Sequence, residues 1–404
     1  YLNNPTRLTQ PLIREGDVLR EASWGEAYEF IFEALEKSSG RSAALAGNKM
    51  SIEDLYLFKS LFAKRLGIKD YDTRWYKNLP DHNETVYAKH GIFDVHSKIT
   101  DFESAKRIFV FGNNIAEELP ILFLRVRKAW LNNNAKIVVA SHEPTEADAF
   151  ASVVLRYKRG SEVALLGGLT KLIIERIGGN SGLLQAVQKL TPDEIEKLTG
   201  VSQHDLICAS EILSNNFLSV SARSLYNEDN AFDIISALAN LCIAGKSERG
   251  FNLFATQANE QASFEIGVVP EEGSKNSRQI LESCADGEIK FLWLAECDPM
   301  TQYHNSHLVE KALENVDFLV VQDVDQTESF HYASVVLPSC AFSEKDGTYM
   351  NLERRVQKQN QIIIPKGMAK ASWKIFSEIG LRIKPETPPF NAKEVFEELC
   401  REYE

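Results

Sequence analysis

The chain has 404 residues, of which 44% are hydrophobic and 25% are charged, and this balance excludes a disordered or fibrous protein. At this length we expect two or three domains, each able to bury its own core. The formal net charge is −12 and no basic tract occurs, so we expect no nucleic-acid partner. No apolar run approaches the roughly 18 residues of a membrane-spanning helix, so we expect no direct membrane insertion.

Short apolar runs that end in polar or glycine-containing turns recur along the chain and predict buried parallel strands. In chain order they are 41–48, 107–114, 136–141, 217–221, 290–295, 318–322 and 334–338. Amphipathic stretches of helical period alternate with these runs. The expected helices are 24–36, 52–66, 116–132, 162–177, 231–244 and 306–314. This alternation predicts doubly wound α/β domains.

Ligands of doubly wound domains bind beyond the carboxyl ends of the strands. The turns 47–48, 112–114, 141–143 and 296–298 follow predicted strands, so we expect them to converge on any ligand crevice. Thr191 and Ser202 each have the side chain of a helix N-cap and are followed by acidic residues. They predict a small helical insert near residues 191–213.

The six cysteines include no CxxC or CxC spacing, which argues against a local zinc or iron–sulfur site. His82, His90 and His96 lie close together in the sequence, but their spacing does not place them on one helix face, so we expect no metal site. Cys297 is interpreted as a buried small hydrophobe rather than a nucleophile. No sequence pattern identifies a catalytic residue. Because residue 1 is Tyr rather than Met, we expect the sequence to be part of a longer or processed chain.

Residues 344–357 read EKDGTYMNLERRVQ and offer polar side chains that can bond a ligand from several directions. This string resembles the EKDGTxxNxERRVQ signature of the molybdopterin oxidoreductase family, which includes formate dehydrogenases and nitrate reductases. Residues 365–373 (PKGMAKASW) and 320–338 (VVQDVDQTESFHYASVVLP) are similar to the flanking family segments. The resemblance covers residues 1 to about 380.

The resemblance implies an α/β fold with two interleaved, doubly wound parallel-sheet domains of the formate dehydrogenase/nitrate reductase type (domains II and III). The first domain would comprise residues 1–72 and 226–385, and the second, residues 73–225, would be inserted into it. A C-terminal helical tail would follow at 386–404. We expect no C-terminal barrel cap, because the chain stops at Glu404.

The resemblance also indicates a pterin-dinucleotide pocket, which we expect to be vestigial. Its candidate cofactor-binding residues are Asn113, Glu117, Thr145, Gln261, Thr348, Asn351 and Gln357. Whether the pocket is open or filled by side chains such as His142, Arg223 and Tyr349 is left open by the sequence.

Three departures from the family pattern bear on function. Residues 71–97 contain no cysteine, so the soft thiolate that many members supply to molybdenum is missing there. Ser141-His142-Glu143 stands where many members have Asp-Pro-Arg, and Arg223 stands where a glycine-rich strand end is expected. The chain therefore resembles the family branch of the large iron–sulfur subunit of respiratory complex I.

That resemblance implies a non-catalytic scaffold domain with no cofactor and no metal in this chain. Its iron–sulfur clusters would be held by a missing N-terminal region, and its partners would be other subunits of a respiratory complex. It would be peripheral, on the cytoplasmic side of the inner membrane. The alternative is a molybdenum or tungsten subunit of formate dehydrogenase type that binds molybdopterin guanine dinucleotide. A third possibility is a stand-alone interaction protein.

Overall fold

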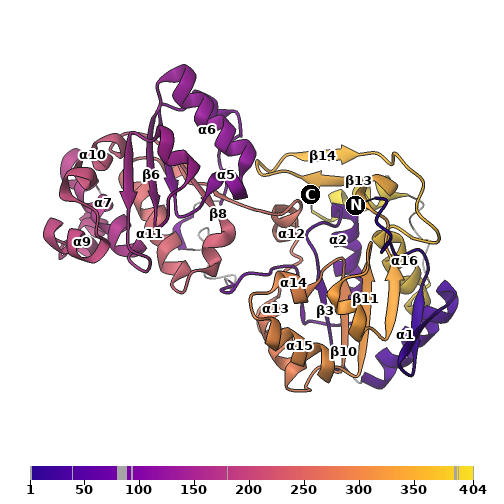
Figure 1. Ribbon diagram of the computed structural model, residues 1–404. Helices are drawn as coiled ribbons and strands as arrows, with labels where there is room; N and C mark the ends of the chain where they lie inside the picture. Colours follow the sequence, from indigo (N-terminus) through magenta and orange to yellow (C-terminus); the bar gives the residue numbers. More distant parts are fainter. Residues whose placement is uncertain are drawn as a thin grey trace. The chain divides into compact units, whose positions relative to one another are not determined.

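A computed structural model describes residues 2–38, 40–79, 89–91, 94–179, 181–385, 389 and 391–403. The chain divides into two compact units, each shown in Figure 1. The first unit comprises residues 1–77 and 257–404, and the second comprises residues 78–256. Both units are α/β, so the predicted fold class is confirmed.

The first unit is built on a seven-stranded sheet of order β2-β1-β12-β11-β10-β3-β4. The five strands from β12 to β4 are parallel, and β1 pairs antiparallel with β12 and β2. A separate hairpin pairs β13 with β14. The strands are β1 (Leu12–Glu15), β2 (Val18–Glu21), β3 (Ser42–Ala46), β4 (Tyr71–Asp72), β10 (Phe291–Ala295), β11 (Phe318–Asp323), β12 (Val335–Pro338), β13 (Gly347–Met350) and β14 (Val356–Gln359).

Helices cover both faces of this sheet because successive strand residues point to opposite faces. Phe291 and Trp293 lie in the core beneath α1, α2, α16 and α17, whereas Leu292 and Leu294 lie in the core beneath α13 and α15. The helices are α1 (Trp24–Ser38), α2 (Ile52–Lys59), α12 (Glu260–Glu265), α13 (Ser277–Ala285), α14 (Pro299–Gln302), α15 (Ser306–Asn315), α16 (Ser372–Ile383) and α17 (Ala392–Glu402).

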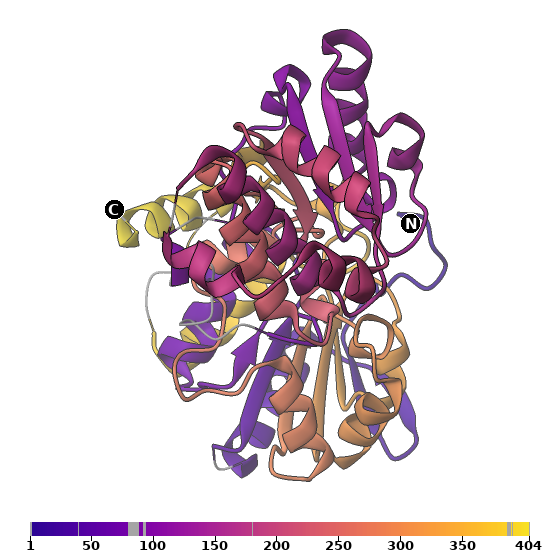
Figure 2. The same cartoon turned by 90° about the vertical axis from the view of Figure 1, so that its left-hand side faces the viewer.

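The second unit has a five-stranded, fully parallel sheet of order β7-β6-β5-β8-β9. The strands are β5 (Arg107–Phe111), β6 (Lys136–Ser141), β7 (Val153–Arg156), β8 (Leu218–Ala222) and β9 (Leu253–Phe254). Its helices are α4 (Asp101–Ser104), α5 (Ile115–Glu118), α6 (Pro120–Asn133), α7 (Glu162–Ile177), α8 (Ser181–Val187), α9 (Pro192–Thr199), α10 (Gln203–Leu213) and α11 (Ala231–Ala244). Helices α7, α9 and α10 face the viewer in Figure 2.

All seven predicted strands are present as β3, β5, β6, β8, β10, β11 and β12. The expected helix 116–132 is wrong as a single element. It is broken at Leu119, which has a non-helical φ of −133°, and α6 restarts with Pro120 at its first position. The expected helix 52–66 is α2 followed by a π-helical turn over Ser60–Arg65. The helices predicted to begin after Thr191 and Ser202 are α9 and α10.

Residues 226–256, which we expected in the first domain, belong to the second unit. The physical reason is that β9 pairs with β8 and α11 packs on α7, so this segment buries its apolar side chains in the second unit. The expected C-terminal tail contains α17, whose Val395 and Leu399 are part of the first unit's core.

Within the part of the chain that is described, no helix has both the length and the apolar character needed to cross a bilayer.

Candidate functional site

Each unit has a point at which the order of its parallel strands reverses. In the first unit the chain moves from β3 to β4 in one direction and from β10 through β11 to β12 in the other. In the second unit the chain adds β6 and β7 on one side of β5 and then β8 and β9 on the other side, with all five strands parallel. Ligands of doubly wound sheets bind at the carboxyl edge of such switch points. The β3/β10 and β5/β8 pairs therefore define the two places to examine.

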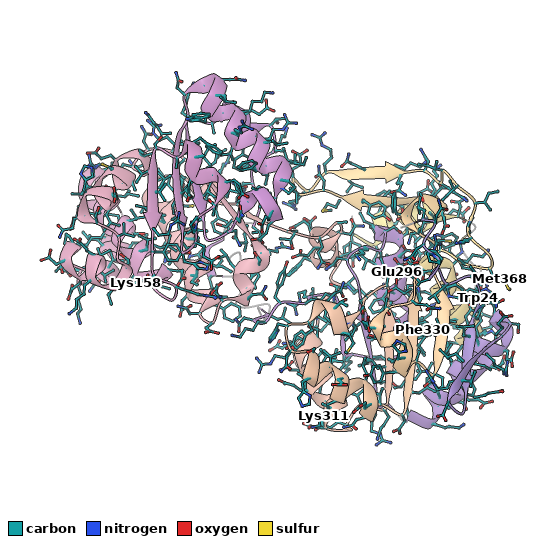
Figure 3. All side chains as sticks on the ribbon, in the orientation of Figure 1. Trp24, Lys158, Glu296, Lys311, Phe330 and Met368 are labelled. Carbon is teal, nitrogen blue, oxygen red and sulfur yellow. The ribbon has the colours of Figure 1, made fainter. Side chains whose placement is uncertain are left out.

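A cavity of about 570 Å³ lies at the β3/β10 switch point of the first unit. Glu296, which directly follows β10, is labelled at this edge in Figure 3. Most of the lining residues have polar side chains, and they come mainly from the turns after β3, β10, β11 and β12 and from the β13–β14 hairpin. Its residues are Lys49, Ala258, Glu296, Cys297, Asp298, Thr301, Gln302, Asp323, Val324, Asp325, Thr327, Cys340, Phe342, Lys345, Tyr349 and Gln359.

A buried charge cluster forms the floor of this cavity. Lys345 Nζ lies 2.5 Å from Asp54 Oδ2 and 3.4 Å from Glu296 Oε1. Burial alone lowers the pKa of Lys345, but the Asp54 and Glu296 carboxylates raise it well above its usual value. Ser372 Oγ also donates to Glu296 Oε1. The cluster thus ties the hairpin to α2 and to the end of β10.

The negative charges at the first turn of α2 are carboxylates of the chain itself, Glu53 and Asp54. Ser51 Oγ accepts from Asp54 N at 3.2 Å, and Asp54 Oδ2 accepts from Ser51 N at 2.9 Å, which is a capping box. Glu53 in the same turn accepts from Thr348 N at 2.9 Å and from Thr348 Oγ1 at 3.0 Å. Both carboxylates occupy the positive end of the helix dipole, where a nucleotide-binding fold places a phosphate.

Two further groups of the lining have shifted pKa values. Burial raises the pKa of Asp323 to about 7, with the Glu296 and Asp298 carboxylates adding to it. Burial also raises the pKa of the Cys297 thiol well above its usual value, and this thiol donates to Leu45 O at 3.3 Å. Cys297 therefore behaves as the buried, unreactive cysteine that the sequence predicts.

At the β5/β8 switch point of the second unit, polar side chains bond to one another and to the backbone. Asn113 Oδ1 accepts from Ala222 N at 2.9 Å, and Asn113 Nδ2 donates to Ser224 Oγ at 2.6 Å and to Glu118 Oε1 at 3.1 Å. A Cβ on Gly112 would lie 2.7 Å from Leu225 Cδ2. Asn113 joins the ends of two strands, and its assignment as a cofactor ligand stays a prediction.

The neighbouring turn after β6 is also closed by internal bonds. Ser141 Oγ donates to Glu143 O at 2.7 Å, and Arg156 donates to Ser141 O at 3.1 Å. Arg223 directly follows β8, is 1% exposed, and forms an ion pair with Asp94 at 2.9 Å. Ser141, Glu143 and Arg223, which stand where the family pattern has other residues, therefore bond within the chain.

The other candidate residues lie outside the lining of the first-unit cavity. Glu117 is exposed on α5, and Thr145 Oγ1 donates to Asp148 Oδ1 at 3.0 Å. Gln261 Nε2 donates to Glu265 Oε1 at 2.8 Å, and Thr348 is held by Glu53. Asn351 Oδ1 accepts from Glu353 N at 3.1 Å and from Arg355 N at 2.9 Å within the hairpin turn, and Gln357 is exposed on β14. Their assignment as cofactor ligands stays a prediction.

The sequence reasoning missed most residues that line the cavity. Asp323 and Asp325 were quoted only as part of a family segment, although they directly follow the predicted strand 318–322 as the other strand-end turns do. Tyr349 lines the cavity and neighbours Thr348, which does not, because alternate residues of β13 point to opposite sides. The alternation of side chains along the predicted hairpin was the sequence signal that could have separated Tyr349 from Thr348.

The segment with His82, His90 and His96, for which we expected no metal site, is described only in part. His82 lies outside the described residues, so the expectation for all three histidines is untested. Among the residues that are described, no group of three or more His, Cys, Asp or Glu side chains is arranged to hold a metal ion.

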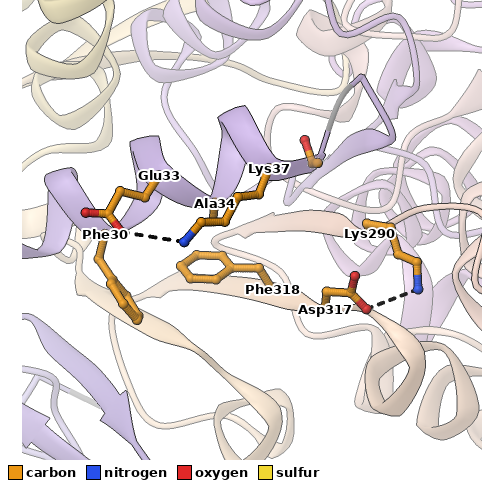
Figure 4. A pocket seen from close by; sticks show the side chains of 8 residues that line it. Phe30, Glu33, Ala34, Lys37, Lys290, Asp317 and Phe318 are labelled. Atoms are coloured by element: carbon orange, nitrogen blue, oxygen red, sulfur yellow. Dashed lines mark hydrogen bonds and ion pairs between the residues drawn. The ribbon is translucent and has the colours of Figure 1, made fainter.

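A second hollow, of about 240 Å³, lies near the amino ends of β10 and β11 (Figure 4). Its aromatic part is Phe30 and Phe318, whose ring centroids are 5.4 Å apart. Its rim carries two ion pairs, Lys37–Glu33 at 3.7 Å and Lys290–Asp317 at 3.0 Å. Because it lies at the amino edge of a parallel sheet, we do not consider it the primary site.

The whole-chain comparison agrees with this architecture. The sequence model of the molybdopterin oxidoreductase family matches residues 7–382, so the chain belongs to that family.

Two relatives and one solved structure illustrate the similarity. The chain is 26% identical to the NADPH-Fe(3+) oxidoreductase subunit alpha of Geobacter sulfurreducens, over 99% of this chain and 52% of that protein. It is 28% identical to the F420-dependent formate dehydrogenase subunit alpha of Methanocaldococcus jannaschii, over 95% of this chain and 63% of that protein. The fold matches acetylene hydratase from Pelobacter acetylenicus with a TM-score of 0.82 at 18% identity, over 98% of this chain and 64% of that one. The chain thus spans about half to two thirds of the length of these proteins.

Neither switch point, taken by itself, combines the room and the hydrogen-bond donors that a pterin dinucleotide needs. A dinucleotide needs room at the switch point and hydrogen-bond donors for its pyrophosphate. In the first unit, Asp54 already occupies the helix terminus, and four carboxylates line the cavity. In the second unit, Asn113 and Ser224 bond to each other at the switch point. We therefore assign no chemical step to that cofactor in this chain.

Proposed function

We propose that this chain is a non-catalytic scaffold module of a multi-subunit oxidoreductase, of the kind found in the large iron–sulfur subunit of respiratory complex I. In that role it supports NADH-to-quinone electron transfer by clusters held outside this chain. The observation that carries the proposal is that the chain's own side chains occupy both places where the fold takes a dinucleotide: Asp54 at α2 and Asn113 between β5 and β8.

The missing thiolate supports the same proposal. Residues 71–97 contain no cysteine, and the six cysteines of the chain lie elsewhere. Molybdenum and tungsten sites favour soft thiolate donors. The described cysteines at 242, 284 and 297 are buried and their pKa values are raised, so they favour packing over ligation.

Partner subunits are the second part of the proposal. The Geobacter and Methanocaldococcus relatives are both named as alpha subunits. We propose that this chain likewise assembles with other subunits, as a peripheral part of a respiratory complex on the cytoplasmic side of the inner membrane. Such a module contributes a stable folded surface rather than a reacting group.

Cofactor content tests the proposal directly. The chain is purified from a bacterial host that makes the molybdenum cofactor, and molybdenum, tungsten and iron are measured by mass spectrometry together with the fluorescence of acid-extracted pterin. A related formate dehydrogenase alpha subunit, expressed in the same host, is the control for cofactor supply. We expect the control to contain metal and pterin and this chain to contain neither. Near-stoichiometric metal and pterin in this chain would contradict the scaffold role.

The alternative is a molybdenum or tungsten subunit of formate dehydrogenase type. One observation favours it: the 570 Å³ cavity at the β3/β10 switch point is of the size that small-molecule sites have. The similarity to a formate dehydrogenase alpha subunit is consistent with it. Formate-dependent reduction of a viologen dye by the metal-loaded chain would establish this alternative.

A further inference from the structure

The lining of the first-unit cavity is rich in unused hydrogen-bond acceptors. Glu296 is only 7% exposed, and its hydrogen bonds from Lys345 and Ser372 both fall on Oε1. Among the described residues, Gln302 Oε1 and Tyr349 Oη are buried without a hydrogen-bond partner. The hydrogen bond that Asp323 receives from Val324 N falls on Oδ1. A ligand that pairs with these acceptor atoms must carry hydrogen-bond donors.

The charges around the cavity also favour a ligand that carries hydrogen-bond donors and positive charge. Four carboxylates line it, and they belong to Glu296, Asp298, Asp323 and Asp325. The two lining lysines do not balance them, because Lys345 is already shared between Asp54 and Glu296 and Lys49 is exposed at the surface. A cavity with an excess of negative charge in its lining concentrates cationic ligands and repels a pyrophosphate.

We infer that the cavity at the β3/β10 switch point binds a small organic cation with several N–H donors, of the alkylguanidinium or polyamine type, in place of an anionic dinucleotide. The volume of about 570 Å³ accommodates such a ligand. Asp323 and Glu296 receive its charged end, and Gln302 and Tyr349 supply the neutral contacts. This inference is independent of the proposed scaffold role. Metal and pterin content tests that role, whereas ligand binding tests the cation site.

Protonation of Asp323 makes the binding depend on pH. Burial raises the pKa of Asp323 to about 7. Lys49, Glu296 and Asp298 act on it directly. The other titratable and charged groups of the cavity lining are Cys297, Asp325, Cys340, Lys345 and Tyr349. The carboxyl group is mostly neutral at pH 6 and mostly ionised at pH 8. Cation affinity should therefore rise about tenfold between these two pH values.

Isothermal titration calorimetry of the whole chain tests the inference. The probes are agmatine, spermidine and guanosine diphosphate, each titrated at pH 6 and pH 8 in the same buffer. We expect both cations to bind with 1:1 stoichiometry and agmatine to bind about tenfold more tightly at pH 8, because Asp323 is then ionised. Guanosine diphosphate should bind at least tenfold more weakly than agmatine, because its pyrophosphate meets the carboxylates.

Two variants assign the binding to this cavity. Asp323→Asn keeps the size of the side chain and should reduce agmatine affinity about tenfold at pH 8 and remove the pH dependence. Asp286→Asn, at an exposed position after α13, is the matched control and should change neither. Thermal melting of each variant checks that it is folded. The inference is wrong if guanosine diphosphate binds more tightly than both cations, if neither cation binds, or if Asp323→Asn binds agmatine as the parent chain does.

Discussion

Lys345 is the residue on which the buried carboxylates around the cavity depend. Its side chain is 3% exposed, and it contacts Asp54, whose side chain is fully buried, and Glu296. A buried carboxylate without a partner is strongly unfavourable, whereas a paired one is tolerated. The Lys345 ammonium group therefore stabilises the first unit mainly by preventing two unpaired buried charges.

We predict that Lys345→Met destabilises the first unit by about 3–5 kcal/mol, because it leaves the Asp54 and Glu296 carboxylates without their cation. Urea unfolding followed by tryptophan fluorescence measures the change. Lys358→Met, at an exposed position on β14, should stay within about 0.5 kcal/mol of the parent chain. A Lys345 variant as stable as the Lys358 control would show that the cluster is not a stabilising contact.

Asp323 lowers the stability of the first unit when it is ionised, whereas Lys345 raises that stability. The direction of the Asp323 effect follows from its raised pKa. Because the folded-state pKa is about 7 and the ordinary value is 3.8, the folded chain binds this proton more tightly than the unfolded chain. The cost of ionising the buried carboxyl therefore grows as the pH rises from about 4 to 7. We expect Asp323→Asn to gain about 1–3 kcal/mol relative to the parent chain between pH 5 and pH 8. Denaturant titrations at the two pH values measure this gain, and a constant difference would contradict it.

At the scale of elements, the turns after β3 and β10 approach so closely that only glycine fits at position 47. A Cβ on Gly47 would lie 2.0 Å from Glu296 O, and Gly47 N donates to Ala295 O at 2.8 Å. Glu296 itself has a φ of +49°, a left-handed conformation that is uncommon for residues other than glycine. The contact between the two turns thus sets the position of Glu296 at the cavity.

We predict that Gly47→Ala destabilises the first unit by roughly 3 kcal/mol, because the methyl group collides with backbone that has no alternative position. Gly25→Ala is the matched control, since its Cβ meets only Ser23 Oγ at 3.8 Å. That substitution lies within α1 and should stabilise the chain by about 0.5–1 kcal/mol. Thermal unfolding of both variants distinguishes the collision from a general effect of removing glycine.

The hairpin shows what a local pattern can predict about an element. Residues 344–357 were identified as a turn followed by polar ligand-binding side chains, and the segment forms β13, a tight turn and β14. The sequence did not reveal which side of the hairpin faces the cavity. Thr348 bonds to Glu53 while Tyr349 lines the cavity, and this choice depends on α2, because Glu53 lies 295 residues from Thr348 in the chain.

At the scale of the whole molecule, each unit has its own sheet and its own buried core. Asn113 belongs to the second unit, where it satisfies the buried Ala222 N–H and joins β5 to β8. Lys345 belongs to the first unit. Because the two residues stabilise different cores, their loss should affect different parts of the chain.

We predict that Asn113→Ala destabilises the second unit by about 2–3 kcal/mol, since it leaves buried polar groups without partners. Hydrogen exchange followed by mass spectrometry should show faster exchange in peptides that cover β5, β6 and β8. Peptides that cover β10, β11 and β12 should keep the exchange rates of the parent chain. Lys345→Met should produce the reverse pattern. Equal acceleration in both sets of peptides would mean that the units unfold as one.

The sequence by itself determined the α/β class, the seven main buried strands and the family. These depend on short apolar runs, turn residues and a long motif, all of which are local in the chain. Only the tertiary structure decided which strand-end turns surround a cavity and which polar side chains are already bonded. Asn113 and its partner Ala222 are 109 residues apart, and Lys345 and Asp54 are 291 apart. No local pattern reports such pairs, because a side chain's hydrogen-bond partner is set by the packing of distant elements.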